Sequence, residues 1–453
     1  MSSMDTIAAI ATPPGSGGIS IIRISGNIAF EIADKIFISA ISVHMMESHS
    51  IRYGKIKDIE TGEIIDECML TKMSAPSSYT REDVVEVNCH GSYIAVRKIL
   101  EQIFKCGARP AEPGEFTKRA FLNGRIDLSE AEAVMDIINS RTEESLRASV
   151  DQLEGRLSSE LNKIRKTLID ILSEIEVTMD YPEYDMEEDT GTNVIQNLNL
   201  AIDELRKLSR TFDRGRIIKE GVRTVIAGKP NAGKSSLMNY MVGKDRAIVT
   251  DVPGTTRDTI EELVEIDGIP LLLVDTAGLR ETDDSVEQIG VFRAKEEIVK
   301  ADLVLYMIDL AEFSGVGAEL FSEIPEEKSI IVLNKTDLVE SADIIQFKGY
   351  FCVKTSVLTG EGLEQLMTEI KKRFELGEML NTQNLITNIR HKILVDDAIN
   401  SLERAKAAFA VQIPLDCLSL DIWAGAKKIG EITGESVSDQ VIENIFARFC
   451  VGK

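Results

Sequence analysis

The sequence lacks the marks of a membrane-spanning or exported protein. No apolar run approaches the roughly 18 residues with which a helix crosses a bilayer. No Lys or Arg precedes Arg23 and no long apolar block follows Met1, so no secretory signal is predicted. The six cysteines form no close pairs and no metal-ligand spacing, which favours a reducing cytosol over a disulfide framework. We therefore expect a cytoplasmic chain without a membrane association.

Positive charge is scarce as well. The chain carries 51 Lys and Arg against 75 Asp and Glu, which gives a formal net charge of −24. Such a chain repels nucleic acid at long range and gains little from counterion release. If RNA is a substrate, a local basic site or a basic partner has to hold it.

The length of 453 residues is too great for one hydrophobic core and suits two or three domains. Residues 1–124 are expected to form a mixed α/β domain. Ile19–Ser25 and Val84–Cys89 are short, apolar and rich in β-branched residues, as strands are. Tyr93–Lys105 has the spacing of a helix.

Residues 125–218 and 379–453 are expected to form a helical domain in two parts. Apolar residues recur at steps of three and four from Leu146 to Ile175, which predicts one stripe along a single helix. Ser129 and Glu132 are spaced as a capping box ahead of this stripe. The further helices are predicted at Val194–Phe212, Ile386–Phe409, Leu415–Lys428 and Val437–Phe449.

Residues 219–378, between the two helical parts, alternate apolar strand-like runs with helical stretches. The pattern predicts a doubly wound parallel sheet, inserted as an α/β domain into the helical one. The strand-like runs are Thr224–Ala227, Leu271–Val274, Leu303–Ile308 and Ile330–Leu333.

The first of these runs leads into a phosphate-loop pattern, Gly228-Lys-Pro-Asn-Ala-Gly-Lys-Ser235. Glycines let backbone N–H groups curl around phosphates, and Lys234 adds positive charge toward the β and γ phosphates. The hydroxyl of Ser235 is a suitable Mg²⁺ ligand. The expected nucleotide contacts here are Asn231, Ala232, Gly233, Lys234, Ser235 and Ser236.

Two further motifs follow at strand ends, in the order that nucleotide hydrolases require. Asp275-Thr276-Ala277-Gly278 can hold Mg²⁺ through water and sense the γ phosphate. Asn334-Lys335-Thr336-Asp337 can read the base, because the Asp337 carboxylate accepts two N–H bonds from guanine that adenine does not offer. The sequence therefore predicts GTP rather than ATP as the nucleotide.

This block resembles the translation-factor-like small GTPases, with Ser356 in the place of their last base-contacting loop. Val357 departs from the alanine that is usual there. Leu279 follows Gly278 where Ras-like enzymes have the glutamine that positions water, and an apolar residue cannot orient water. Glu287 is the candidate for that role.

The segment 250–258 resembles the switch loop of GTPases that potassium activates. In these enzymes K⁺ takes the position of an arginine finger, and its charge acts in the transition state. The resemblance implies that Thr256 completes the Mg²⁺ shell together with Ser235. It implies nucleotide contacts from Thr250, Thr255 and Thr256, and K⁺ ligands from Asn231, Thr250, Val252 and Thr255.

Motifs along the whole chain resemble one family, the tRNA-modifying GTPases called MnmE or TrmE. The matching segments are Asp5–Ile7, Ala11–Gly18, Arg23–Gly26, Cys89–Gly91, Pro113–Arg125, Asp275–Glu281, Glu431–Glu435 and Phe449–Lys453. The resemblance implies an N-terminal α+β folate-binding domain that dimerises, a split helical domain and an inserted P-loop GTPase domain.

The resemblance also implies the reaction. GTP hydrolysis, with K⁺-dependent pairing of the GTPase domains and Glu287 helping to position water, accompanies a modification of certain tRNAs. A FAD-containing partner protein and this chain, as a heterotetramer, would install an aminomethyl or carboxymethylaminomethyl group at C5 of the wobble uridine. The one-carbon unit would come from 5-formyl- or 5,10-methylene-tetrahydrofolate.

By motif position, the folate contacts fall on Arg23, Glu86, Arg125 and Lys453. A carboxylate suits the amidine-like edge of a pterin, and cationic side chains suit its glutamyl tail. Cys450 has two interpretations: a thiolate that takes part in one-carbon transfer, or a small buried hydrophobic residue. His90 is interpreted as structural.

Two rival functions stay open. One is a GTP-switched ribosome-assembly factor without chemistry of its own. The other is a stand-alone folate enzyme with a regulatory GTPase domain, which acts without a flavin partner or tRNA.

Overall fold

The structure is a computed structural model, which divides the chain into two compact units. The described residues are 5–13, 15–180, 187–244, 261–266, 269–275, 296–312, 325–339, 347, 349–374 and 385–453. Unit 1 comprises residues 1–135, 152–198 and 400–453, and unit 2 comprises residues 136–151 and 199–399. Among the described residues, no helix combines the length and the apolar composition needed to span a membrane.

Unit 1 contains a seven-stranded sheet of order β3-β4-β5-β6-β2-β1-β7, in which only the β1–β7 pair is parallel. The expected strands at Ile19–Ser25 and Val84–Cys89 are confirmed within β2 and β6. The strands are β1 Ile7–Ile10, β2 Gly17–Ser25, β3 Phe37–Ile38, β4 Ser50–Lys57, β5 Ile64–Met73, β6 Val84–Gly91 and β7 Arg109–Pro110.

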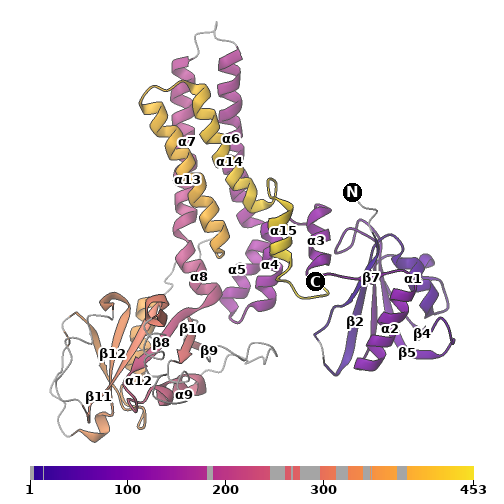
Figure 1. Ribbon diagram of the computed structural model, residues 1–453, viewed down its shortest axis with the longest axis horizontal. Coiled ribbons are helices and arrows are strands. Elements are labelled where there is room, and N and C mark those ends of the chain that lie inside the picture. Colours follow the sequence, from indigo (N-terminus) through magenta and orange to yellow (C-terminus); the bar gives the residue numbers. More distant parts are fainter. Residues whose placement is uncertain are drawn as a thin grey trace, which may run out of the picture. The chain divides into compact units, whose positions relative to one another are not determined.

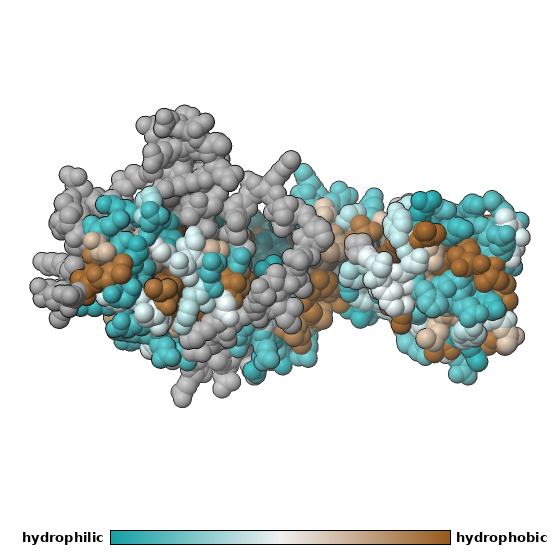
Figure 2. All heavy atoms as spheres, turned by 90° about the horizontal axis from the view of Figure 1, so that it is seen from below, coloured by the Kyte–Doolittle hydropathy of each residue, from teal (hydrophilic) through white to brown (hydrophobic). Residues whose placement is uncertain are grey.

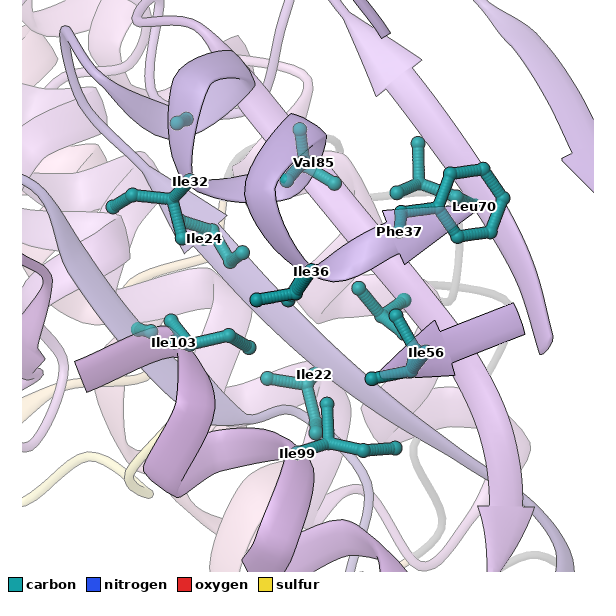
Figure 3. Close-up of a cluster of buried hydrophobic side chains, with 14 of the residues drawn as sticks. Ile22, Ile24, Ile32, Ile36, Phe37, Ile56, Leu70, Val85, Ile99 and Ile103 are labelled. Atoms are coloured by element: carbon teal, nitrogen blue, oxygen red, sulfur yellow. The ribbon is translucent and has the colours of Figure 1, made fainter. Parts of the chain in front are cut away.

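Helices α1 (Ala29–Ile36) and α2 (Tyr93–Lys105) cover one face of this sheet (Figure 1). Their apolar sides meet inward-pointing strand residues such as Ile22, Ile24 and Val85 in a closed core (Figure 3). The opposite face leaves Ile51, Tyr53 and Met69 exposed, and apolar patches are visible on the surface of this part of the chain (Figure 2, right). The sheet thus has one buried and one open face.

Two stretches of the chain, before and after the unit 2 sheet, are helical, and their helices range from 8 to 25 residues. Helix α6 packs along α14, and α15 packs against α3. The helices are α3 Glu115–Leu122, α4 Leu128–Asn139, α5 Glu143–Leu153, α6 Arg156–Asp180, α7 Glu187–Arg210, α8 Phe212–Glu220, α13 Ile389–Ala410, α14 Leu415–Thr433 and α15 Asp439–Phe446.

Two sequence predictions about these helices are wrong. The apolar stripe from Leu146 to Ile175 runs over two helices, because Gly155 adopts a left-handed φ of 76° between α5 and α6. The capping box also lies elsewhere: Asp127 and Glu130 exchange hydrogen bonds between side chain and backbone N–H at 2.8 and 2.9 Å. Ser129 is already inside α4 and is buried.

Unit 2 contains a six-stranded sheet of order β13-β12-β11-β8-β10-β9. All neighbouring pairs are parallel except β10–β9, so the predicted parallel sheet is confirmed with one antiparallel edge strand. The strands are β8 Val222–Gly228, β9 Glu261–Ile266, β10 Ile269–Asp275, β11 Leu303–Asp309, β12 Ser329–Asn334 and β13 Phe351–Lys354.

Apolar clusters lie on both faces of this sheet. Helices α9 (Lys234–Lys244) and α12 (Leu363–Phe374) contribute to one cluster through Leu237, Leu366 and Ile370. Tyr306 and Ile331 belong to the other cluster. A strand buried on both faces reads as a continuous apolar run, which is why β8, β10, β11 and β12 were predicted from the sequence and the edge strands β9 and β13 were not.

A buried ion cluster in unit 1 joins the loop before β1, the loop before β6 and α3. The Arg119 guanidinium donates to Glu82 at 3.1 Å, to Glu115 at 2.9 Å and to Asp5 at 2.9 Å. Burial acts to raise the pKa of Glu115, but hydrogen bonds from Arg109, the Glu112 backbone and Arg119 hold that pKa below its ordinary value. The cluster fixes α3 against the sheet.

We predict that Arg119→Met lowers the free energy of unfolding of unit 1 by about 3–5 kcal/mol, because two buried carboxylates lose their common partner. Thermal melting followed by circular dichroism measures this. The matched control is Arg97→Met, whose exposed pair with Glu101 should contribute within about 0.5 kcal/mol. Equal melting temperatures for both variants would contradict the structural role of the cluster.

Candidate functional site

The polar motifs of unit 2 meet at one edge of its sheet. Strands β8, β10, β11, β12 and β13 are parallel, so their carboxyl ends lie on the same side. The phosphate-loop pattern follows β8, which lies between β11 and β10. The strands that follow β8 in the chain, β9 and β10, lie on one side of it in the sheet, and the next strand, β11, lies on its other side. Ligands of open α/β sheets bind at the point where the strand order reverses in this way.

The loop after β8 depends on backbone conformations that few residues adopt. Gly228 and Gly233 have φ values of 142° and 101°, and Asn231 has a φ of 63°. A Cβ atom on Gly228 would collide with the carbonyl oxygen of Met307 in β11, and one on Gly233 with Nδ2 of Asn334. The glycines of the motif are therefore required by close packing as well as by loop shape.

Lys234 begins α9, and its ammonium folds back over the loop. Its Nζ donates to the carbonyl oxygens of Gly228 at 3.0 Å and Lys229 at 2.8 Å. Ser235 and Ser236 follow in the first turn of α9 with exposed side chains. Backbone N–H groups at a helix start attract anions, and a lysine beside them adds a full charge.

Asn334, at the end of β12, joins three loops. Its Nδ2 donates to the carbonyl oxygen of Ala232 in the phosphate loop at 2.8 Å. Its Oδ1 accepts from the backbone N–H of Val357 at 3.2 Å and from the hydroxyl of Thr355 at 3.4 Å. One buried amide thus sets the spacing of the loops that follow β8, β12 and β13.

The residues after Asn334 form a short turn at the same edge. Lys335 has a φ of 66° and pairs with Asp309 at 2.5 Å, and this hydrogen bond raises the pKa of the lysine above its ordinary value. The Asp337 side chain is exposed in the 3₁₀ turn Thr336–Leu338. Ser356 is buried, and its hydroxyl accepts from the backbone N–H of Thr359 at 3.2 Å.

The side chains of the other residues predicted for this site lie outside the described part of the chain. Asp275 closes β10, and its side chain lies outside the described part. The further residues outside the described ranges are Thr250, Val252, Thr255, Thr256, Thr276, Ala277, Gly278 and Glu287.

A second group of predicted residues lies on the open face of the unit 1 sheet. Arg23 and Glu86 are cross-strand partners, and Nε of the arginine donates to Oε1 of the glutamate at 2.8 Å. Arg23 also donates through Nη1 to the carbonyl oxygen of Gly452 at 3.1 Å. Arg125 donates to the carbonyl oxygen of Tyr79 at 3.1 Å and lies 4.7 Å from the centre of its ring.

The segment 449–453 is held beside this group by backbone hydrogen bonds. The N–H of Gly114 donates to the carbonyl oxygen of Cys450 at 3.3 Å, and that of Phe116 to the carbonyl oxygen of Lys453 at 3.2 Å. Lys453 is therefore brought near Arg23, whose guanidinium also lies 5.5 Å from the ring of Phe116. Segments separated by more than 400 positions in the sequence thus form one surface, since Arg23 contacts Gly452 directly.

Cys450 is exposed, so its interpretation as a small buried hydrophobic residue is wrong. His90 is exposed too, and its Nδ1 lies 2.7 Å from Asp66 Oδ1. The hydrogen bond with Asp66 raises the pKa of this histidine. Among the described residues, no group of three or more His, Cys, Asp or Glu side chains could hold a metal ion.

Tyr79 and Asp309 are two residues that sequence reasoning missed. Tyr79 stacks beside both Arg23, at 5.4 Å, and Arg125, and its hydroxyl lies 2.9 Å from that of Thr117. Asp309 neutralises Lys335. Neither residue belongs to a recognised motif. The one sequence signal for Asp309 was its position directly after the apolar run 303–308.

Comparisons with known proteins identify relatives that match nearly the whole chain. A family model described as the MnmE helical domain matches residues 128–450, and one described as the GTP-binding protein TrmE N-terminus matches residues 6–125. A protein of Acetivibrio thermocellus named tRNA modification GTPase MnmE is 51% identical over 99% of both chains. A protein of the same name from Carboxydothermus hydrogenoformans is 47% identical over 99% of both chains. Another from Lactiplantibacillus plantarum is 45% identical over 99% of this chain and 98% of its own length.

We predict that Asn334→Asp weakens guanine-nucleotide binding by on the order of tenfold or more. The substituted oxygen would face the carbonyl oxygen of Ala232, so an attractive contact becomes a repulsion between two acceptors inside the protein. Titration with a fluorescent guanine nucleotide measures the affinity. The matched control is Asn400→Asp, on the exposed side of α13, which should bind the nucleotide as the unsubstituted chain does. Full affinity in Asn334→Asp would show that the hydrogen bond to Ala232 does not shape the site.

Proposed function

Because this chain belongs to the MnmE family of tRNA modification GTPases, we propose that it binds and hydrolyses GTP at the carboxyl edge of the unit 2 sheet in the course of tRNA modification. The observation that carries this proposal is the buried hydrogen bond from Asn334 to the phosphate loop. That bond supports the proposal because it links the turn proposed to read the base to the loop proposed to bind the phosphates, and a single nucleotide would have to contact both.

We propose that one group of described residues binds the phosphates and another group binds the base. We assign the phosphates to the N–H groups of Ala232 and Gly233 and to Lys234, which is already folded over the loop. The base is assigned to Lys335, Asp337 and the Ser356 loop. The Asp337 carboxylate is exposed and can accept the N1 and 2-amino protons of guanine.

Mg²⁺ fits the donor set at the start of α9. Ser235 offers an exposed hydroxyl oxygen one residue after Lys234, and hydroxyl oxygen is a ligand that Mg²⁺ accepts. We propose Thr256 and, through water, Asp275 as further oxygen donors. The ion when bound neutralises charge that develops on the β and γ phosphates.

K⁺ fits Asn231, whose backbone φ of 63° presents an exposed side chain at the phosphate loop. Its amide oxygen is a neutral donor of the kind that K⁺ takes. We propose Thr250, Val252 and Thr255 as the other ligands, with Thr276, Ala277 and Gly278 near the γ phosphate. Glu287 is proposed to orient the attacking water, and paired GTPase domains to enclose the ion.

A folate derivative is proposed to bind at the open face of the unit 1 sheet. The donor set fits, because Glu86 has one carboxylate oxygen paired with Arg23 and can present the other to an amidine edge. Arg23, Arg125 and Lys453 supply positive charge for an anionic tail, and Tyr79 supplies an aromatic surface. The exposed thiol of Cys450 is available for one-carbon transfer from a 5-formyl or 5,10-methylene form.

We propose that the same open face pairs with that of a second copy. Tyr53, Met69 and Asn88 are neighbours in register across β4, β5 and β6, and the first two are exposed apolar residues. Exposed apolar patches of this kind mark interaction sites. In such a homodimer Arg23 and Glu86 would lie at the interface.

The complete reaction is proposed to need two more partners. A FAD-containing protein, in a heterotetramer with this chain, would act with it on C5 of the wobble uridine of certain tRNAs. The net charge of −24 suggests that basic surface of the partner contributes to holding tRNA. We propose domains at 1–124, 125–218, 219–378 and 379–453, with the GTPase domain inserted in the helical one, and a cytoplasmic location.

We predict that GTP turnover by the purified chain is on the order of a hundredfold faster in KCl than in NaCl at equal ionic strength, since a fixed cation at the phosphates stabilises the transition state. Phosphate release measures the rate. Equal rates in both salts would remove K⁺ from the mechanism.

We predict that Glu287→Ala binds GTP normally and hydrolyses it poorly in the same assay, because it loses the carboxylate proposed to orient the attacking water. A full rate of hydrolysis in this variant would remove Glu287 from the mechanism.

We predict that Arg125→Met weakens binding of 5-formyltetrahydrofolate by about tenfold, the scale of one hydrogen bond to a charged group. Isothermal titration calorimetry measures the affinity. Arg125 is exposed and contacts Tyr79, so the melting temperature should stay unchanged. Arg97→Met, on the helix-covered side, is the matched control; unchanged affinity in Arg125→Met would exclude that arginine from the folate site.

A further inference from the structure

Asp309 is a nearly buried carboxylate at the nucleotide edge of the unit 2 sheet. It ends β11, with 7% of its side chain exposed. Its Oδ1 accepts from the backbone N–H of Ala311 at 2.9 Å, and its Oδ2 accepts from Nζ of Lys335 at 2.5 Å. The backbone N–H of Leu310 donates to the carbonyl oxygen of Asn334 at 3.0 Å, which keeps the two strand ends together.

Lys335 lies among competing carboxylates. Asp309 is its hydrogen-bonded partner, and Glu312 and Asp337 act on it through their charge. Lys335 and Asp337 belong to one turn, in which the N–H of Leu338 donates to the carbonyl oxygen of Lys335 at 3.1 Å. A lysine ammonium on its flexible stem can pair with any carboxylate within reach.

We propose that Asp309 is a specificity-determining residue: by holding the Lys335 ammonium, it keeps the Asp337 carboxylate available for guanine. This inference rests on the proposed function, because it concerns how the same site reads its base. A lysine that paired with Asp337 would occupy the oxygens that accept the N1 and 2-amino protons. Guanine would then have to displace an ion pair within its own binding turn.

The geometry favours Asp309 over Asp337 as the partner of this lysine. Asp309 is buried and already oriented by the Ala311 N–H, whereas the Asp337 side chain is exposed to water. A charge-assisted hydrogen bond is stronger with the shielded and pre-oriented carboxylate. Removal of the Asp309 charge leaves Glu312 and Asp337 as carboxylates that act on Lys335, and of these two Asp337 belongs to the same turn as the lysine.

The preference for GDP over IDP, as the ratio of the two affinities, measures the contact between Asp337 and the 2-amino group of guanine. Hypoxanthine, the base of IDP, keeps the N1 proton and lacks that amino group. In the full-length chain, calorimetry should show that Asp309→Asn reduces this preference by on the order of tenfold. The asparagine still accepts from Ala311, so the backbone contact is kept. Asp309→Glu, which retains the charge, should keep most of the preference.

The double variant Asp309→Asn with Lys335→Met separates this proposal from a merely structural role. With no ammonium left to occupy Asp337, the GDP-to-IDP preference should return toward that of the unsubstituted chain, even if both nucleotides bind more weakly. Lys335→Met alone should weaken both nucleotides by a similar factor. An unchanged preference in Asp309→Asn, or a preference that stays low in the double variant, would overturn the proposal.

Asp302→Asn is the matched control. Asp302 immediately precedes β11, at the opposite edge of the sheet, and pairs with Arg216 at 2.6 Å. Its GDP-to-IDP preference should be unchanged. If the unsubstituted chain shows no preference for GDP over ADP, the proposed GTPase function fails; if it shows that preference and Asp309→Asn keeps the GDP-to-IDP ratio, only the inference about Asp309 fails.

Discussion

Parallel strand pairing is the constraint on which the candidate nucleotide site depends. Parallel strands bring their carboxyl ends to one edge, so loops that are distant in the sequence become neighbours. The register sets the details: Gly228 pairs with Met307, and Asp309 with Asn334. Because of this register the Asn334 amide reaches the phosphate loop. A shift of one residue would turn that side chain to the other face of the sheet.

The open face of unit 1 depends on register in the same way, but in antiparallel pairing. Arg23 lies opposite Glu86, and Glu86 lies opposite Thr71, so one row of side chains crosses three strands. The segment 449–453 then adds contacts to this row through Gly452. Gly452 has a φ of 94°, and a Cβ atom there would collide with the carbonyl oxygen of Ile10. The close approach of this segment to β1 therefore requires glycine.

The sequence predicted the elements that can be recognised from neighbouring residues in the chain. It missed the features that depend on contacts between distant parts of the chain. The four predicted strands of unit 2, β8, β10, β11 and β12, are mostly buried, so each reads as a short apolar run, whereas the edge strands β9 and β13 do not. The apolar residues from Leu146 to Ile175 keep steps of three and four across Gly155, so their spacing did not reveal the break between α5 and α6. Tyr79 and Asp309 could not be assigned roles, since their partners lie on other elements. Cys450 was ambiguous because exposure follows from packing and not from its neighbours in sequence.

Ion pairs and a backbone hydrogen bond also hold the opposite edge of the unit 2 sheet. Asp302 accepts from Arg216 of α8 at 2.6 Å and from the backbone N–H of Arg223 at 2.9 Å, and Arg223 in turn pairs with Glu297. These partly buried ion pairs resist bending of the sheet, as does its close-packed core. A nucleotide bound at the carboxyl edge, as proposed, would therefore meet a rigid support, and its binding free energy would act on the loops rather than on strand positions. Such a division would suit the proposed GTP site, whose phosphate-binding groups must be held in place while other loops adapt to the bound nucleotide.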